Sequence, residues 1–314
     1  MDEGKEAAEF AKSIGLAHWS VPMATRIGDD FDRIVSDLDE PFADPSSFPT
    51  WYLSRETARY VPVAIGGDGG DELLAGYKRY GQHLRSSWRG RRRLPGIGVI
   101  PTIERKGLSK LLSEIGMTWE DSYSLRFSGF MPGQRAFLQP SYKARHKTYW
   151  RREAAHLSPV ASMINLDMHN YLPEYILRKT DLCSMAHGLE IRVPLLDHCL
   201  FESLLTVSER DRFTKPSKML FQSLFSSSEV EVLWSRKKKG FNPPLRDWLR
   251  HDLAPRLPGL GKDLCELSRS QIASSRVDAM VARYSGGAEH FAEQVLQLLI
   301  LSESLKQLST GTPG

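Results

Sequence analysis

Short apolar patterns of two kinds follow one another through the first 66 residues. Helical periodicity covers 3–14, 31–38 and 48–60, whereas 17–23 alternates like a short strand and 61–66 has the apolar character of a short buried strand. The first helix carries its apolar stripe on Ala7, Phe10, Ala11 and Ile14, and Gly15 ends it. Helices and strands that alternate in short units predict a parallel α/β layer.

From about residue 105 onward the apolar patterns are almost all helical. Examples lie at 124–130, 164–177, 218–225 and 290–308. Between the two regions, RGRRR is followed by two prolines and two glycines, which predicts an exposed loop. We therefore expect one domain in three parts: an α/β part at 1–85, a basic loop at 86–104 and a mostly helical part at 105–314. The arginines at 89–93 suit a solvated loop or a lid that faces an anion.

Composition narrows the class of protein. With 41% hydrophobic and 25% charged residues, the chain has the balance of a globular domain. A net charge of +4, concentrated in one arginine-rich segment, is too small and too local to predict nucleic-acid binding. No apolar run approaches the roughly 20 residues that span a bilayer, and the acidic N-terminus is unlike a signal peptide. Three widely spaced cysteines predict neither a disulfide framework nor a zinc site. We expect a cytoplasmic protein.

The segment GGDGGDE, residues 66–72, is here called the acidic turn. A strand that ends at Gly66, a turn through Gly67, Asp68, Gly69 and Gly70, and a helix from Asp71 place it at the carboxyl edge of a parallel sheet, where such sheets bind ligands. Glycines allow the backbone to approach a ligand, and N–H groups at a helix start attract anions. Carboxylates repel a phosphate unless Mg²⁺ lies between them, so Asp68 and Asp71 are candidate ligands of one metal ion.

The acidic turn also has a purely structural interpretation. Asp71 or Glu72 in a first helical turn is an ordinary capping residue that stabilises the helix by ~0.5–2 kcal/mol. Glycine-rich turns between strands and helices are common as well. The segment is not a Walker A loop, because no G-K-[ST] follows it. Taken alone, the acidic turn leaves both interpretations open.

Residues 176–200 concentrate charged and polar side chains among apolar ones. They comprise Arg178, Lys179, Asp181, His187, Glu190, Arg192, Asp197 and His198. On a helix over 180–188, Leu182 and Met185 are predicted to be core, while Asp181 and Ser184 share another face. Arg192 is expected in an extended segment because Pro194 follows closely. The histidines also fit satisfied structural positions, and Arg178 and Arg192 also fit structural ion pairs.

A second basic stretch, WSRKKKGFNPPLRDWL, covers 234–249. Four consecutive cations end in a glycine-aromatic turn, and Pro-Pro then precedes the start of an amphipathic helix. A rigid loop of this kind can hold one lysine where charge develops on a leaving group. The alternative is a solvated run of lysines.

Together these stretches resemble the synthetase domain of glutamine-hydrolysing asparagine synthetases, a family that also includes β-lactam synthetase-like enzymes. The family pattern S-G-D-G-G-D-E-x-x-x-G-Y is matched at 66–77, with Gly66 in place of serine. S-M-A-H-x-L-E-x-R-V-P-x-L-D is matched at 184–197, and K-x-G-F-x-x-P-L-x-x-W-L at 238–249. The resemblance runs from about residue 2 to about residue 305.

The resemblance implies a parallel-sheet fold of the ATP-pyrophosphatase type, like adenine nucleotide alpha hydrolases, with 1–85 as its nucleotide-binding part. It implies that aspartate attacks ATP to give β-aspartyl-AMP and pyrophosphate, and that ammonia then displaces AMP to form asparagine. The implied catalytic residues are Asp68, Glu72 and Lys238; Asp71 and Asp68 hold Mg²⁺; Gly66, Gly67, Gly69, Gly70 and Tyr77 contact ATP; and Asp181 and Arg192 support the substrate. A homodimer is compatible with this family.

Two departures from the family pattern limit what the chain is expected to do alone. No S-G-G-x-D-S phosphate-binding loop occurs in the 314 residues, so the α/β layer is expected to be truncated at its N-terminus. Asp2, rather than a nucleophilic cysteine, follows Met1. Glutamine-derived ammonia is therefore expected from an upstream domain or a separate glutaminase chain. Loss of the phosphate loop removes charge-assisted hydrogen bonds of about 1.5–3 kcal/mol each.

Three hypotheses follow. The chain is an asparagine-forming enzyme in fragment or split form; or an inactive, partner-dependent homologue; or a family amidotransferase that acts on another carboxylate. The acidic positions of the turn, the Arg192 segment and the Lys238 loop all match the family, which favours the first hypothesis. If the acidic turn and Lys238 act on the same bound polyphosphate, both must face one cleft.

Overall fold

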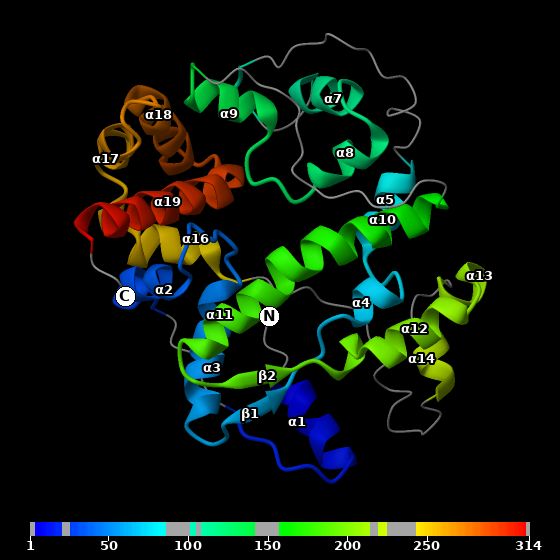
Figure 1. The fold of residues 1–314 in the computed structure, drawn as a ribbon. Coiled ribbons are helices and arrows are strands. Elements are labelled where there is room, and N and C mark those ends of the chain that lie inside the picture. Colours follow the sequence, from blue (N-terminus) through cyan, green and yellow to red (C-terminus); the bar gives the residue numbers. More distant parts are fainter. Residues whose placement is uncertain are drawn as a thin grey trace.

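The computed structural model describes residues 4–20, 26–85, 101–104, 108–141, 157–213, 219–224 and 243–311. Helices predominate, and one small parallel sheet lies beside the N-terminal helices (Figure 1). The α/β class is confirmed in this coarse form, whereas the ATP-pyrophosphatase type and the three-part division stay predictions. No described helix has the length and apolar content needed to cross a membrane.

The N-terminal half contains these elements, in chain order: α1 (Gly4–Ser13), α2 (Phe31–Asp37), α3 (Ser47–Ala58), β1 (Val63–Ile65), α4 (Gly70–Leu73), α5 (Lys78–Arg85), α7 (Leu108–Ile115), α8 (Trp119–Ser124) and α9 (Pro132–Leu138). The next elements are α10 (Pro159–Leu166), the π-helix η1 (Asp167–Leu177), α11 (Arg178–Met185), β2 (Glu190–Arg192), the 3-10 helix η2 (Pro194–Leu196), α12 (His198–Thr206), α13 (Glu209–Arg212) and α14 (Met219–Leu224). The C-terminal elements are α16 (Leu245–Asp247), η3 (Trp248–Asp252), η4 (Ala254–Arg256), α17 (Leu260–Leu267), α18 (Ser274–Ser285), η5 (Glu289–Phe291) and α19 (Ala292–Thr310).

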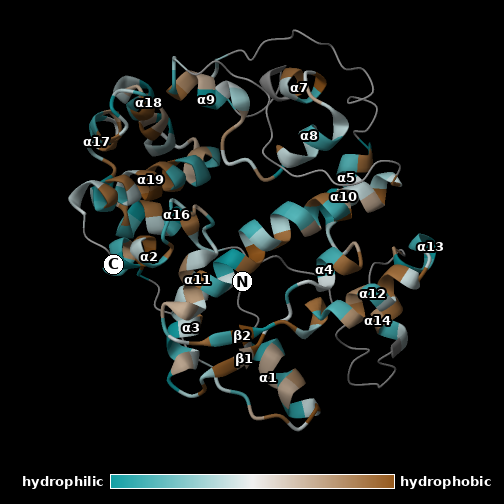
Figure 2. Cartoon of the chain, viewed as in Figure 1, coloured by the Kyte–Doolittle hydropathy of each residue, from teal (hydrophilic) through white to brown (hydrophobic). Residues whose placement is uncertain are grey.

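The sheet pairs two segments that are far apart in the sequence. β1 and β2 run parallel, with Val63 opposite Glu190 and Ile65 opposite Arg192. The predicted strand at 61–66 is confirmed in its position, and Arg192 is extended as expected. The prediction that the strand at 61–66 is buried is wrong. β1 is hydrophobic (Figure 2), yet Ile65 is 78% exposed. Sheet neighbours that would bury such a strand on both faces are absent from the described residues.

The main core joins the first and last parts of the chain. Helices α2 and α3 pack with η3, α17, α18 and α19, and their buried side chains form one cluster. At its centre Phe48 is fully buried, with its ring 5.8 Å from that of Phe31 and 5.6 Å from that of Trp248. These contacts hold the N-terminal helices against the C-terminal ones (Figure 1).

A long helical rod crosses the molecule and is built from α10, η1 and α11 in succession (Figure 1). Its middle part is a π-helix that contains Pro173. Proline lacks an N–H and crowds the preceding turn, so a wider hydrogen-bond pattern accommodates it without ending the helix. The rod thereby carries side chains from residue 159 to residue 185 past the acidic turn.

Several other sequence predictions can be compared with the elements. The helices expected at 3–14, 31–38, 48–60 and 290–308 are confirmed, as is the one at 218–225 over its described residues. Residues 17–20 do not form the expected strand, and of the helix expected at 124–130 only Ser124 is helical, since α8 ends there. Met185, predicted to be core, is 56% exposed, because α11 ends there and buries Cys183 and Ser184 instead. Helix α1 buries none of its predicted apolar stripe.

We predict that Phe48→Ala lowers the free energy of unfolding by about 3–5 kcal/mol, because it leaves a cavity between three helical segments. Urea unfolding followed by circular dichroism measures the loss. Leu53→Ala on the same helix removes a side chain that is 63% exposed and should change stability by at most about 0.5 kcal/mol. Equal losses for the two variants would contradict the assignment of the core.

Candidate functional site

The acidic turn lies where β1 passes into α4, and its neighbours come from the β2 region. The backbone N–H of Gly66 donates to the carbonyl of Arg192 at 2.8 Å, which continues the parallel pairing. Gly69 adopts a φ of +96°, and α4 starts at the next residue. The predicted order of strand, glycine turn and helix is therefore confirmed.

The glycines of the turn meet this chain's own side chains. A Cβ added at Gly69 would lie 2.3 Å from a methyl of Leu196, and those at Gly66 and Gly70 would lie 3.1 Å from Ile191 and Leu195. At these three positions the absence of a side chain allows close packing against the β2–η2 segment. A Cβ at Gly67 would have no heavy atom within 4 Å, and the residue is exposed. Gly67 therefore offers an open approach to the backbone of the turn.

Asp68 is fixed by the helical rod. The hydroxyl of Thr180 on α11 donates to its Oδ2 at 3.1 Å. Thr180 also lines a cavity of about 450 Å³, so the residue that holds Asp68 belongs to the wall of this cavity. The lining residues are Pro173, Glu174, Leu177, Arg178, Thr180, Asp181, Ser184, Ile191 and Val193. The cavity brings together α11 and β2, the two elements that carry Asp181 and Arg192.

Glu72 differs from the two aspartates of the turn. Its side chain is only 1% exposed, whereas Asp68 and Asp71 are half-buried, and the hydroxyl of Tyr77 donates to its carboxylate. Burial raises the pKa of Glu72 above its ordinary value, and the hydrogen bond from Tyr77 opposes that rise. Glu72 is thus anchored inside the protein beside the more accessible Asp71.

The carboxylates of the acidic turn have the donor chemistry that Mg²⁺ prefers, and their joint binding of one ion stays a prediction. Mg²⁺ in proteins uses one or two carboxylates together with substrate phosphates and water. Asp68 and Asp71 supply two carboxylates beside the open position at Gly67, and Glu72 is held by Tyr77. In the part of the chain that the structure describes, the one clustered trio of metal-ligand side chains is Asp197, His198 and Cys199. It is exposed, and Asp197 already accepts hydrogen bonds from the backbone N–H groups of Cys199 and Leu200 as the cap of α12.

The charged residues of 176–200 are mostly in ion pairs. Arg192, with 66% of its side chain exposed, pairs with Glu190 at 2.7 Å, and Arg178 pairs with Glu40 at 2.9 Å. Asp181 is exposed on the rim of the cavity, with Ser184 on the same lining, so the predicted shared face is confirmed. His187 packs against Trp51 with ring centres 4.4 Å apart, which supports its structural interpretation. The roles of Asp181 and Arg192 toward a substrate stay predictions.

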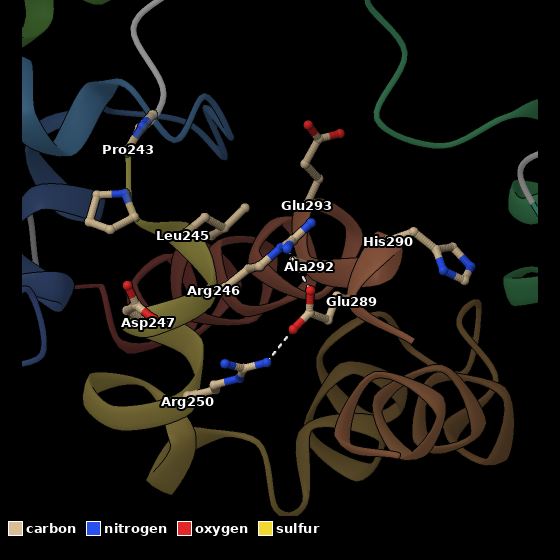
Figure 3. A pocket seen from close by; sticks show the side chains of 10 residues that line it. Pro243, Leu245, Arg246, Asp247, Arg250, Glu289, His290, Ala292 and Glu293 are labelled. Carbon is tan, nitrogen blue, oxygen red and sulfur yellow. Dashed lines mark hydrogen bonds and ion pairs between the residues drawn. The ribbon is translucent and has the colours of Figure 1, made fainter. Parts of the chain in front are cut away.

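A second hollow, of about 720 Å³, lies beside Pro243 and Pro244 (Figure 3). Figure 3 shows Arg246 and Arg250 both directed at Glu289, with which they form ion pairs. The helix predicted after Pro-Pro is confirmed, since α16 begins at Leu245. Lys238 lies outside the described residues, so its approach to the acidic turn stays a prediction. The two cavities share no lining residue in the described ranges.

Sequence reasoning missed three residues that organise the site. Thr180 holds Asp68, and Arg79 forms a buried ion pair with Asp167 at 2.6 Å beside Tyr77. Thr180 stands next to Asp181, and Arg79 is two positions after Tyr77, so both adjoin predicted site residues. The ion pair spans 88 positions, and apolar periodicity carries no signal for such a pairing.

The sequence was compared with known proteins. The family profile described as "Asparagine synthase" matches residues 1–306. "Asparagine synthetase [glutamine-hydrolyzing] 1" of Bacillus subtilis is 28% identical over 308 residues, which cover 93% of this chain and 45% of that protein. "Putative asparagine synthetase [glutamine-hydrolyzing]" of Mycobacterium bovis is 32% identical over 269 residues, or 78% of this chain and 39% of that protein. The chain spans less than half the length of these relatives. No solved structure matches it.

We predict that Gly69→Ala destabilises the protein by about 2–4 kcal/mol, because a Cβ is unfavourable at positive φ and also collides with Leu196. Thermal and urea unfolding measure the loss. Gly81→Ala on the exposed surface of α5 is the matched control, since nothing lies within 4 Å of its added Cβ, and it should stabilise by roughly 0.5–1 kcal/mol. If Gly69→Ala were neutral, the close packing of the turn on Leu196 would be wrong.

Proposed function

Because this chain belongs to the asparagine synthase family, we propose that it supplies the synthetase chemistry of ATP-dependent asparagine formation from aspartate. The observation that carries the proposal is the hydrogen bond between Thr180 and Asp68, which sets the acidic turn beside a cavity large enough for a small substrate. Ligand pockets in proteins have volumes of about 300–1,000 Å³. The cavity thus has the size of a small-molecule site.

The proposed reaction has two balanced steps. An oxygen of the β-carboxylate of aspartate attacks the α-phosphorus of ATP, and the bond to pyrophosphate breaks, which gives β-aspartyl-AMP. Ammonia then attacks the acyl carbon, AMP leaves with the electron pair of the broken C–O bond, and a proton is lost from nitrogen. Asp68 and Asp71 would hold Mg²⁺, which would supply positive charge to the phosphates when bound.

Each implied residue has a defined task in this proposal. Asp68 and Asp71 hold the metal beside the open backbone at Gly67, and Glu72, fixed by Tyr77, keeps a third carboxyl next to them. Asp181 and Arg192 contribute charge at the cavity and at the end of β2. Lys238 is assigned to the developing negative charge on the phosphates, where a fixed cation stabilises the transition state most strongly.

The nitrogen source is part of the proposal. The relatives named as glutamine-hydrolysing are more than twice as long as the matched region, so glutamine hydrolysis is assigned to protein outside this chain. Free ammonia replaces glutamine when the chain is assayed by itself. Cytoplasmic aspartate and ATP are the proposed small-molecule substrates.

We predict that Asp68→Asn lowers aspartate-dependent pyrophosphate release by at least ~100-fold, the scale seen when an electrostatic group of a transition state is removed. The assay contains the purified chain, ATP, Mg²⁺, aspartate and ammonium. Asp29→Asn, which alters an exposed carboxylate before α2, should leave the rate unchanged.

A panel of carboxylates added to the same assay tests the substrate. Release with another carboxylate but not with aspartate would replace asparagine synthesis by a different amide-forming reaction of the same type. Absence of release with every carboxylate, together with absence of Mg²⁺-dependent ATP binding, would overturn the proposed function. Lys238→Met should lower the rate, because it removes the cation assigned to the developing charge on the phosphates.

A further inference from the structure

An aromatic cage encloses one arginine directly behind the acidic turn. The guanidinium carbon of Arg79 lies 3.4 Å from the ring centre of Tyr77 and 4.4 Å from that of Tyr171. The rings of Phe127 and Tyr80 lie at 4.9 and 5.4 Å. A desolvated cation over an aromatic face gains about 2 kcal/mol or more, so this cage fixes Arg79 and the rings together.

Asp167 at the start of η1 completes the cage. It is fully buried and accepts from Arg79 and from the hydroxyl of Tyr80, each at 2.6 Å, and from Tyr123 at 3.0 Å. The Nε of Arg79 also donates to the hydroxyl of Tyr123 at 2.9 Å. Burial opposes the charge of Arg79, but Asp167 and the two tyrosines raise the pKa of Arg79 above its ordinary value. Burial also raises the pKa of Asp167 above its ordinary value, and the guanidinium of Arg79 with the hydroxyls of Tyr80 and Tyr123 opposes that rise.

The cage connects the helical rod to the acidic turn. Asp167 and Tyr171 belong to η1, Arg79 and Tyr80 to α5, and Tyr77 to the segment between α4 and α5. Tyr77 contacts Arg79 through its ring and Glu72 through its hydroxyl. A continuous chain of contacts therefore runs from Asp167 through Arg79 and Tyr77 to Glu72.

We propose that the Arg79–Asp167 ion pair is a positioning device for the acidic turn: it fixes the ring of Tyr77, and Tyr77 fixes the carboxyl of Glu72 next to Asp71. Its consequence for turnover rests on the proposed function, whereas its effect on the turn does not. Only arginine suits this position, since its planar guanidinium stacks on rings while its edge donates to Asp167 and Tyr123. Lysine retains the positive charge, but it lacks a planar group that stacks on rings and the paired N–H donors of a guanidinium.

The test measures amide hydrogen exchange of the ligand-free protein, with the peptide that covers the acidic turn as the probe and a peptide of α19 as the internal reference. Arg79→Lys and Tyr77→Phe should each speed exchange in the turn by about tenfold relative to α19, the change expected for ~1.4 kcal/mol of lost local stability. The double variant should exchange no faster than the faster single variant, because both substitutions break the same chain of contacts.

Matched controls come from a similar cluster on α3. Arg55 lies over the ring of Tyr52 at 4.9 Å, and both residues contact Asp30. Arg55→Lys and Tyr52→Phe should lower overall stability without a selective effect on the acidic turn. If Arg79→Lys does not fold, Tyr77→Phe alone, which removes one hydroxyl, decides the outcome against Tyr52→Phe.

Three results would overturn the proposal: exchange in the turn that rises only in parallel with α19, exchange that rises equally in the Arg55 and Tyr52 controls, or effects of Arg79→Lys and Tyr77→Phe that add.

A turnover measurement separates this proposal from the proposed function. If the wild-type chain releases pyrophosphate, Tyr77→Phe should lower kcat more than it raises KM for aspartate. If the wild-type chain neither releases pyrophosphate with any carboxylate nor binds ATP with Mg²⁺, the proposed function fails, while the exchange results still decide the role of the ion pair.

Discussion

The parallel pairing of β1 with β2 is the constraint on which the candidate site depends. It joins residues 63–66 to residues 190–192, and the bond from Gly66 to Arg192 sets where the acidic turn begins. Once this register is fixed, Leu195 and Leu196 pack against Gly70 and Gly69. These contacts restrict the backbone conformation of the turn. The two segments with the strongest family patterns meet for this reason.

The helical rod is the second element that fixes the acidic turn. Through Thr180 it holds Asp68 at the cavity, and through Asp167 it holds Arg79 and the aromatic cage behind the turn. The acidic turn is therefore supported at two points by one continuous helical element, with Asp68 and Asp71 half-buried and Glu72 fully buried. Buried ion pairs contribute little net stability, so a role in fixing a particular geometry is the better account of Arg79 and Asp167.

Local features of the site were predictable from the sequence, and its long-range contacts were not. Glycines and acidic residues at 66–72 predicted the turn and the start of α4, because positive φ and helix starts are set by a few neighbouring residues. Met185 was misassigned and β1 was predicted to be buried, since both depend on which elements pack nearby. The bonds from Thr180 to Asp68 and from Arg79 to Asp167 join residues 112 and 88 positions apart, and no periodicity encodes such partners.

We propose that the acidic turn and the adjoining cavity form a single site for a magnesium-bound polyphosphate. Amide hydrogen exchange with and without Mg²⁺ and ATP tests it most directly. We expect ATP with Mg²⁺ to slow exchange selectively in the acidic turn and in residues 178–192, and ATP with a chelator to leave exchange there unchanged. Protection confined to other parts of the chain, or equal protection without the metal, would contradict it.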